Sequence, residues 1–196
     1  RKISYWRYFT FVFLAWSTHV LIDCFNTYGT QIMEPFNSER FAIGNISIID
    51  LFFLGPLLFG LFLAVIVFRK RRNLRSHIGW ITTLWLCLYF AASLFMKHIA
   101  TNHFIEMMAK KGIETDELVA APTFSNIFLW RMNARDKDGY YVSYWSLFDD
   151  ENREAVVSKT SHGHELEKGF EDSEDLKTLK WFCRGWHKVF KVDGDP

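Results

Sequence analysis

An uncharged apolar run sets the first limit on how this chain can fold. Residues 51–68 read LFFLGPLLFGLFLAVIVF, without a charged side chain. A helix needs roughly 20 residues to cross the hydrocarbon core of a bilayer. The run therefore predicts a transmembrane helix, in which Pro56 is tolerated if neighbouring helices satisfy the freed backbone groups.

Two more segments predict spans. Residues 78–96 are apolar and stop at Lys97, and residues 8–22 form a shorter run with a polar end. Beyond that lysine, charged and polar residues are spread throughout. We therefore expect a membrane α-helical region with three transmembrane helices over residues 1–98, and an outer domain over residues 99–196.

The basic residues predict the orientation. Residues 69–77, RKRRNLRSH, form a short and strongly positive loop, and loops of this kind stay in the cytoplasm. The basic chain start through Arg7 then lies on the same side, while the loop 24–50 and the second domain lie outside. Because the net charge is only +1, no nucleic-acid partner is expected.

The second domain shows the pattern of a small α+β fold. Residues 126–134 and 140–148 are rich in aromatic and β-branched residues and flank Asp138-Gly139, which predicts an antiparallel β-hairpin. Residues 155–159 are expected to extend this sheet.

Helices and a last strand are expected around that hairpin. A helix is predicted over residues 101–111. Ser173 is a capping residue ahead of an amphipathic helix, and residues 186–192, WHKVFKV, predict a final strand. Residues 99–196 are thus predicted to form an extracytoplasmic α+β domain.

His19 and Asp23 are candidate metal ligands. Four residues apart on a helix, they project on one face about one turn apart, and imidazole nitrogen with carboxylate oxygen suits zinc, manganese or iron. The alternative is that they only mark the polar end of a membrane helix. Asp50, directly before the next span, is a candidate third ligand or general base, or else the N-cap of that span.

The loop between these residues carries possible substrate contacts. Tyr28 is the second candidate catalytic residue beside Asp50, at a turn that would shape the substrate entrance. The candidate substrate-binding residues in the same loop are Asn26, Gly29, Thr30 and Arg40. Their donors could hold a phosphate or a carboxylate.

The segment THVLIDCFNTYGTQIMEPFNSERFAIGNISIID, residues 18–50, resembles the signature region of the bacterial membrane-bound metal-dependent hydrolase family. That family is also described as LexA-binding, inner-membrane-associated hydrolases. The resemblance continues through the basic loop to PTFSNIFLWRMNARDKDGYYVSYWSLFD and LKWFCRGW. It implies a multi-pass protein of the bacterial inner (plasma) membrane with a divalent-metal site carried by His19, Asp23 and Asp50.

One departure from the family pattern affects that site. Members usually carry an earlier membrane region with a Pro-Asp-x-Asp stretch and a His-Arg-Gly-x-Thr-His-Ser stretch, and neither occurs here. The chain is therefore expected to represent the C-terminal portion of the family and to hold about half of the site.

These observations predict a membrane-bound metal-dependent hydrolase with zinc or manganese as cofactor. A phospholipid or lipid-linked phosphate at the outer face of the inner membrane is the expected substrate, so membrane lipid is the expected partner. LexA follows from the family name alone and would have to use the cytoplasmic loop. The alternative is a non-enzymatic membrane protein whose outer domain binds a partner.

Overall fold

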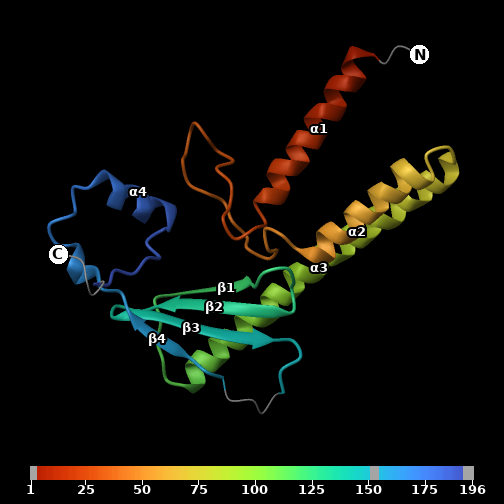
Figure 1. The fold of residues 1–196 in the computed structure, drawn as a ribbon. Helices are drawn as coiled ribbons and strands as arrows, with labels where there is room; N and C mark the ends of the chain where they lie inside the picture. Colours follow the sequence, from red (N-terminus) through yellow and green to blue (C-terminus); the bar gives the residue numbers. More distant parts are fainter. Residues whose placement is uncertain (1–3, 151–154, 192–196) are drawn as a thin grey trace.

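The structure, a computed structural model, describes residues 4–150 and 155–191. Helices make up its first half, and an antiparallel sheet of four strands forms its second half (Figure 1). The first half contains α1 (Tyr5–Asp23), α2 (Leu51–Phe62), the π-helical continuation η1 (Leu63–Val67) and α3 (Arg72–Lys110). The predicted order of a helical region followed by a small domain with an antiparallel sheet is confirmed.

The helices expose most of their apolar surface. In Figure 1, α2 and α3 run side by side in opposite directions, and α1 diverges from them. No residue of α1 is buried. Among the described residues, α3 is the one helix long and apolar enough to cross a membrane, and only 11% of its most apolar window is buried. Residues Leu51–Val67 form a shorter apolar helix.

Close backbone packing joins α2 to α3. A Cβ added to Gly60 would lie 2.2 Å from Thr82 Oγ1, so only glycine fits at this contact. The indole of Trp85 donates a hydrogen bond of 3.0 Å to the carbonyl of Phe52. The antiparallel pair predicted around the basic loop is therefore a packed unit.

Helix α3 continues past Lys97, where the third span was predicted to end. The helix predicted over residues 101–111 is the continuation of α3, because no glycine or proline interrupts residues 80–111. The Lys97 ammonium donates to the carbonyls of Ile43 and Gly44, so the charge is satisfied without ending the helix. The loop 24–50 thereby docks on α3.

The sheet has the order β1-β2-β3-β4, and every neighbouring pair is antiparallel. Its strands are β1 (Glu117–Pro122), β2 (Leu129–Arg135), β3 (Gly139–Ser146) and β4 (Ser158–Ser161). The predicted hairpin is confirmed as β2 and β3. The core lies between one face of the sheet and the second half of α3, and its largest members are Trp130, Phe104 and Met132.

Two expectations for the second domain need correction. Strand β1 was not predicted, because its sequence, ELVAAP, contains one β-branched residue. The final strand predicted over residues 186–192 is wrong for 186–191, and residue 192 lies outside the described residues. Val189 donates one backbone hydrogen bond to His162, but no strand ladder follows. The helix capped by Ser173 is confirmed as α4 (Glu174–Phe182).

Candidate anion-binding pocket and the predicted metal ligands

His19 and Asp23 lie together at the end of α1, as their spacing predicts. His19 Nε2 is 3.5 Å from Asp23 Oδ2, and the two side chains are 70% and 43% exposed. Such an exposed pair is stabilised little by its charges. The two residues nevertheless present two adjacent groups that could bind a metal ion.

Asp50 is buried and already has three hydrogen-bond donors. Its carboxylate accepts from the backbone amides of Phe52 and Phe53 at 3.0 and 3.1 Å, and the Tyr89 hydroxyl donates to it at 2.7 Å. Asp50 is thus the N-cap of α2, the alternative role considered from the sequence.

The three predicted ligands do not form one cluster. Within the described part of the chain, Asp50 does not join His19 and Asp23 in a group whose ligand atoms lie within 4.8 Å of one another. The carboxylate of Asp50 is held at the start of α2 by its cap, which explains the separation. Two ligands do not make the three-ligand site implied by the resemblance.

Three of the predicted substrate-binding residues shape the loop 24–50. The side chain of Asn26 accepts from the backbone amides of Tyr28 and Gly29, at 2.9 Å each. Gly29 has a φ of +76°, and an added Cβ would meet Ala42 Cβ and the Phe41 carbonyl at 2.7 Å. Thr30 pairs with Phe41 through two backbone hydrogen bonds. These contacts fix the turn that carries Tyr28.

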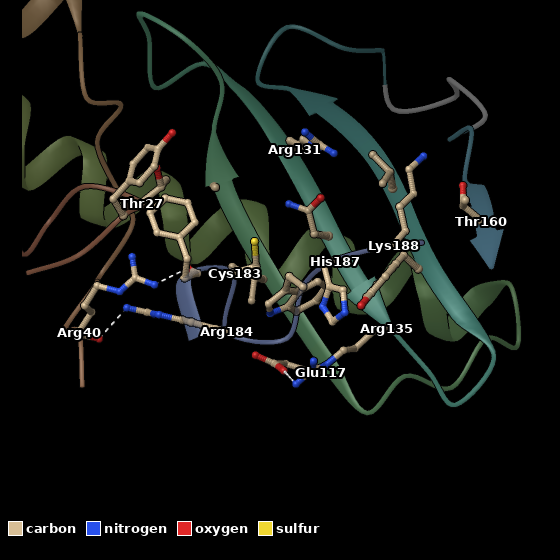
Figure 2. Close-up of a pocket in the computed structure, with 18 residues that line it drawn as sticks. Thr27, Arg40, Glu117, Arg131, Arg135, Thr160, Cys183, Arg184, His187 and Lys188 are labelled. Carbon is tan, nitrogen blue, oxygen red and sulfur yellow. Dashed lines mark hydrogen bonds and ion pairs between the residues drawn. The ribbon is translucent and has the colours of Figure 1, made fainter. Parts of the chain in front are cut away.

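Tyr28 and Arg40, from the same loop, line a pocket of about 560 Å³ (Figure 2). Its other walls are the sheet face opposite α3 and the C-terminal segment 182–188. Strand alternation explains the composition of the sheet wall: Trp130, Met132 and Ala134 face the core, so Arg131, Asn133 and Arg135 face the pocket. The volume is within the usual range for small-ligand sites.

The pocket is strongly cationic although the whole chain is nearly neutral. Five lining residues are arginine or lysine, and only one, Glu117, is acidic. The five cationic residues are Arg40, Arg131, Arg135, Arg184 and Lys188. Glu117 pairs with Arg135 at 2.5 Å, so the other cations have no carboxylate partner in the lining.

Arg40 and Arg184 tie the loop to the C-terminal segment. Arg184 Nη2 donates to the Arg40 carbonyl at 2.6 Å, and Arg40 Nη2 donates to the Trp181 carbonyl at 3.2 Å. The Arg40 guanidinium also lies 4.9 Å from the centre of the Trp181 ring. These contacts join two walls that are about 140 residues apart in the sequence.

The positive charges of Arg131 and Lys188 are the ones most available to bind a ligand. Across residues 4–150 and 155–191, neither side chain has a hydrogen bond or an ion pair, and the ammonium of Lys188 lies 5.8 Å from the Phe190 ring. Guanidinium and ammonium groups bind phosphate and carboxylate oxygens through charge-assisted hydrogen bonds. The pocket can therefore bind an anionic group at these two residues.

Only some of the residues that line this pocket could be predicted from the sequence. Alternation along β2 could have placed Arg131 and Arg135 on one face, once that strand was predicted. Arg184 and Lys188 follow α4 in a segment without regular structure, where no periodicity indicates which way a side chain points. Arg40 was predicted as a substrate contact, and it lines the pocket.

Exposed apolar helices and a separate sheet domain with a polar pocket are features expected of a membrane-anchored protein. The chain belongs to the YdjM inner membrane protein family, whose model matches residues 1–100. This agrees with the inner-membrane location expected from the sequence. No curated protein and no solved structure matched the chain.

Proposed function

We propose that this protein binds a phosphate-bearing lipid, either a phospholipid or a lipid-linked phosphate, through its head group in the cationic pocket. The single observation that carries the proposal is the charge of the lining, five basic residues against one acidic residue already paired. Binding of an anion reduces the electrostatic repulsion between these like charges. The adjacent aromatic rings of Tyr28, Phe182 and Trp186 would contact the apolar parts of the ligand.

The fold supports a lipid as the source of the phosphate. In this proposal α1, α2 with η1, and the first part of α3 span the inner membrane. The basic segment Arg69–Arg75, which forms the turn before α3 and the first residues of that helix, then lies in the cytoplasm, and the sheet and pocket lie on the outer face. In Figure 1, the turn between α2 and α3 lies at one end of the helix pair and the sheet lies toward the other. The pocket would then face the head-group layer.

Each charged residue has a distinct part in this proposal. Arg131 and Lys188 contact the phosphate, because neither side chain has a hydrogen bond or an ion pair among the described residues. Arg40 and Arg184 hold the loop against the C-terminal segment and add positive charge. Arg135 is neutralised by Glu117 and packs 5.0 Å over Trp186, so it serves as part of the wall.

Calorimetric titration of the detergent-solubilised chain tests the proposal. Dihexanoyl phosphatidic acid, dihexanoyl phosphatidylcholine and inorganic phosphate are titrated separately. We expect the first to bind most tightly and the affinity to fall with added salt. Replacing Arg131→Gln together with Lys188→Gln should weaken binding at least tenfold, the equivalent of about 1.4 kcal/mol.

Lys111→Gln is the matched control, because Lys111 is exposed at the end of α3 and outside the pocket lining. Equal affinity in the double variant and the control would contradict the proposal. Tighter binding of free phosphate than of phosphatidic acid would retain the anion site and exclude a lipid as its ligand.

Hydrolysis at the end of α1 is the second candidate function. The observation in its favour is the exposed contact between His19 and Asp23, which leaves both groups accessible to a metal ion. Metal content is compared in the wild type and in His19→Ala/Asp23→Ala, together with release of phosphate or fatty acid from a short-chain phospholipid. Unchanged metal content and product release in the double variant would exclude this site.

A further inference from the structure

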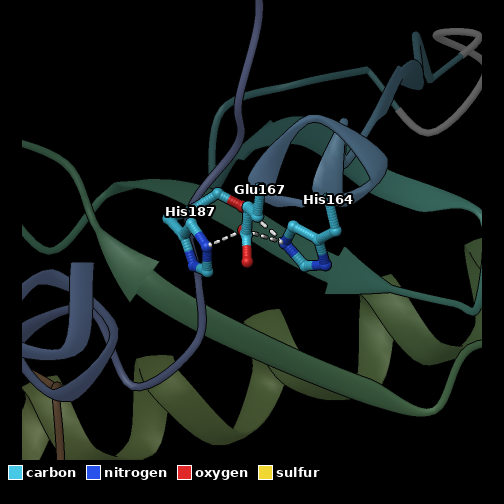
Figure 3. Close-up of side chains that lie close together, drawn as sticks. All are labelled: His164, Glu167 and His187. Atoms are coloured by element: carbon cyan, nitrogen blue, oxygen red, sulfur yellow. Dashed lines mark hydrogen bonds and ion pairs between the residues drawn. The ribbon is translucent and has the colours of Figure 1, made fainter. Parts of the chain in front are cut away.

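A second group of metal-ligating side chains lies in the outer domain, far from α1 in the sequence. His164 and Glu167 belong to the 3₁₀ helix η2 (His164–Glu167), and His187 follows α4. Their ligand atoms all lie within 4.8 Å of one another. Figure 3 shows the two imidazole rings on either side of the Glu167 carboxylate, each with a nitrogen toward it. These three residues are called the His-Glu-His cluster below.

The backbone brings the cluster together at a close approach of two segments. Val189 donates a hydrogen bond of 2.9 Å to the His162 carbonyl, which places His187 beside η2. Gly163 has a φ of +69°, and an added Cβ would lie 1.9 Å from the Val189 carbonyl oxygen. Only glycine permits this approach. The His164 and His187 rings then stack with their centres 4.7 Å apart.

The cluster is partly closed from solvent. The side chains of His187 and Glu167 are 7% and 10% exposed, whereas that of His164 is 41% exposed. His187 Nε2 lies 2.6 Å from Glu167 Oε1, and His164 Nε2 lies 3.9 Å from the same oxygen. Two ligand atoms of a tetrahedral zinc ion lie roughly 3.3 Å apart, so one separation is shorter and the other longer than a bound ion requires, and small side-chain shifts would bring both to that value. His164 Nε2 also lies 3.3 Å from the His187 carbonyl oxygen, a contact that the ion would replace.

Lys180 holds the other oxygen of Glu167. Its ammonium lies 2.5 Å from Oε2 and lowers the pKa of that carboxyl below its ordinary value, with the His187 hydrogen bond acting in the same direction. Glu167 is therefore ionised at neutral pH. One oxygen pairs with the lysine, and the other is directed to the two imidazoles.

We propose that His164, Glu167 and His187 bind one divalent metal ion, with zinc preferred, through His164 Nε2, Glu167 Oε1 and His187 Nε2. Two imidazoles and one carboxylate are an established zinc ligand set that leaves a fourth position for water. For His187 Nε2 to bind the ion, the ring must carry its proton on Nδ1, and the contact between Nε2 and Glu167 Oε1 must open to admit the metal. The site lies outside the residues matched by the family model.

The consequence is a cross-link between distant parts of the outer domain. The ion would fasten the segment after α4 to η2, and His187 also lines the pocket. Lys180 opposes the ion by its charge, and the buried Nδ1 atom of His187 has no hydrogen-bond partner within the described residues. Both features predict an affinity below that of zinc sites with a complete outer shell.

Zinc titration against a chromophoric chelator tests this site in the detergent-solubilised chain after removal of bound metal. We expect one equivalent of zinc, and a loss of affinity of at least about tenfold in His164→Gln. His164 is the most exposed ligand, so the variant should stay folded, which circular dichroism checks. The matched control is His162→Gln, whose ring stacks on His164 at 4.8 Å but lies outside the cluster.

A second variant tests whether the charge of Lys180 weakens zinc binding. Lys180→Met should raise zinc affinity several-fold, because it removes a positive charge next to the ligand carboxylate. Cobalt substituted for zinc should give visible absorption bands in the wild type that His164→Gln weakens. The absence of zinc binding by the folded wild type, equal affinity in His164→Gln and the control, or loss only in His19→Ala/Asp23→Ala would each overturn the proposal.

Discussion

The two halves of the molecule differ in how far their large apolar side chains are exposed. In the helical half, Trp80 is 74% exposed and α1 has no buried residue, whereas in the sheet half Trp130 is fully buried against α3. A soluble chain could not leave that much apolar surface in water. The difference shows that the first half needs an apolar surrounding for its stability and that the second half supplies its own core.

The largest expected effect concerns the core between the sheet and α3. Trp130→Ala removes the largest fully buried side chain of the sheet domain and should cost about 3–5 kcal/mol of unfolding free energy. Trp80→Ala in the helical half should change it by less than about 0.5 kcal/mol. Thermal unfolding of the detergent-solubilised chain, followed by near-ultraviolet circular dichroism, measures both. Similar losses in the two variants would contradict the comparison.

The next effect concerns the start of α2, where Asp50 contacts Tyr89 of α3. Asp50→Ala leaves two helix amides uncapped and the buried Tyr89 hydroxyl without its acceptor, with an expected cost of about 2–4 kcal/mol. Asp50→Asn keeps an acceptor oxygen and should lose less than half as much. The same unfolding measurement distinguishes them, and equal stability of the wild type and Asp50→Ala would remove the structural role assigned to Asp50.

Packing inside the helical half should matter only where helices touch. Gly60→Ala places a Cβ against Thr82 and should cost about 1–3 kcal/mol. Gly55→Ala meets nothing within 4 Å and should be neutral or slightly stabilising. Adding Thr82→Ala should restore much of the loss. If Gly55→Ala proves as harmful as Gly60→Ala, the paired arrangement of α2 and α3 is wrong.

The smallest effect depends on pH and lies in the hairpin turn between β2 and β3. The Tyr141 hydroxyl, 2.6 Å from Asp136 Oδ2, lowers the pKa of that carboxyl well below its ordinary value, and Lys159 acts in the same direction. The folded state therefore favours the ionised form, and this stability is present above the ordinary aspartate pKa and lost as the pH falls below it.

Asp136→Asn should thus lower stability by about 1 kcal/mol at pH 7, and the difference from the wild type should shrink toward pH 2. Denaturant unfolding at several pH values measures this difference, because all other titrating groups are common to both proteins. A difference that stays constant with pH would show that the charge of Asp136 has no role in the turn.

The features that the sequence predicts well are local ones. The spacing of His19 and Asp23 is enough to bring them together, and Asp138-Gly139 is enough to locate the hairpin. Asp50 shows the limit of such reasoning. Its cap of α2 is local and was among the expectations, but its contact with Tyr89, 39 positions away, has no sequence signal.

The His-Glu-His cluster illustrates the same limit more strongly. His164 and Glu167 are three residues apart, a spacing that would place the two side chains on opposite faces of a strand. The 3₁₀ turn instead brings both onto one side. His187 comes from a segment that was expected to be a strand and has no regular structure, so its position depends on Gly163 and Val189.

The continuity of α3 has a mechanical consequence. Its 39 residues make a rod of about 58 Å, nearly twice the thickness of a hydrocarbon core, and its second half forms part of the sheet's core. No flexible linker separates the two parts. In the proposed topology, a tilt or rotation of the first part of α3 would therefore act as a lever on the sheet domain and move the cationic pocket relative to the lipid surface.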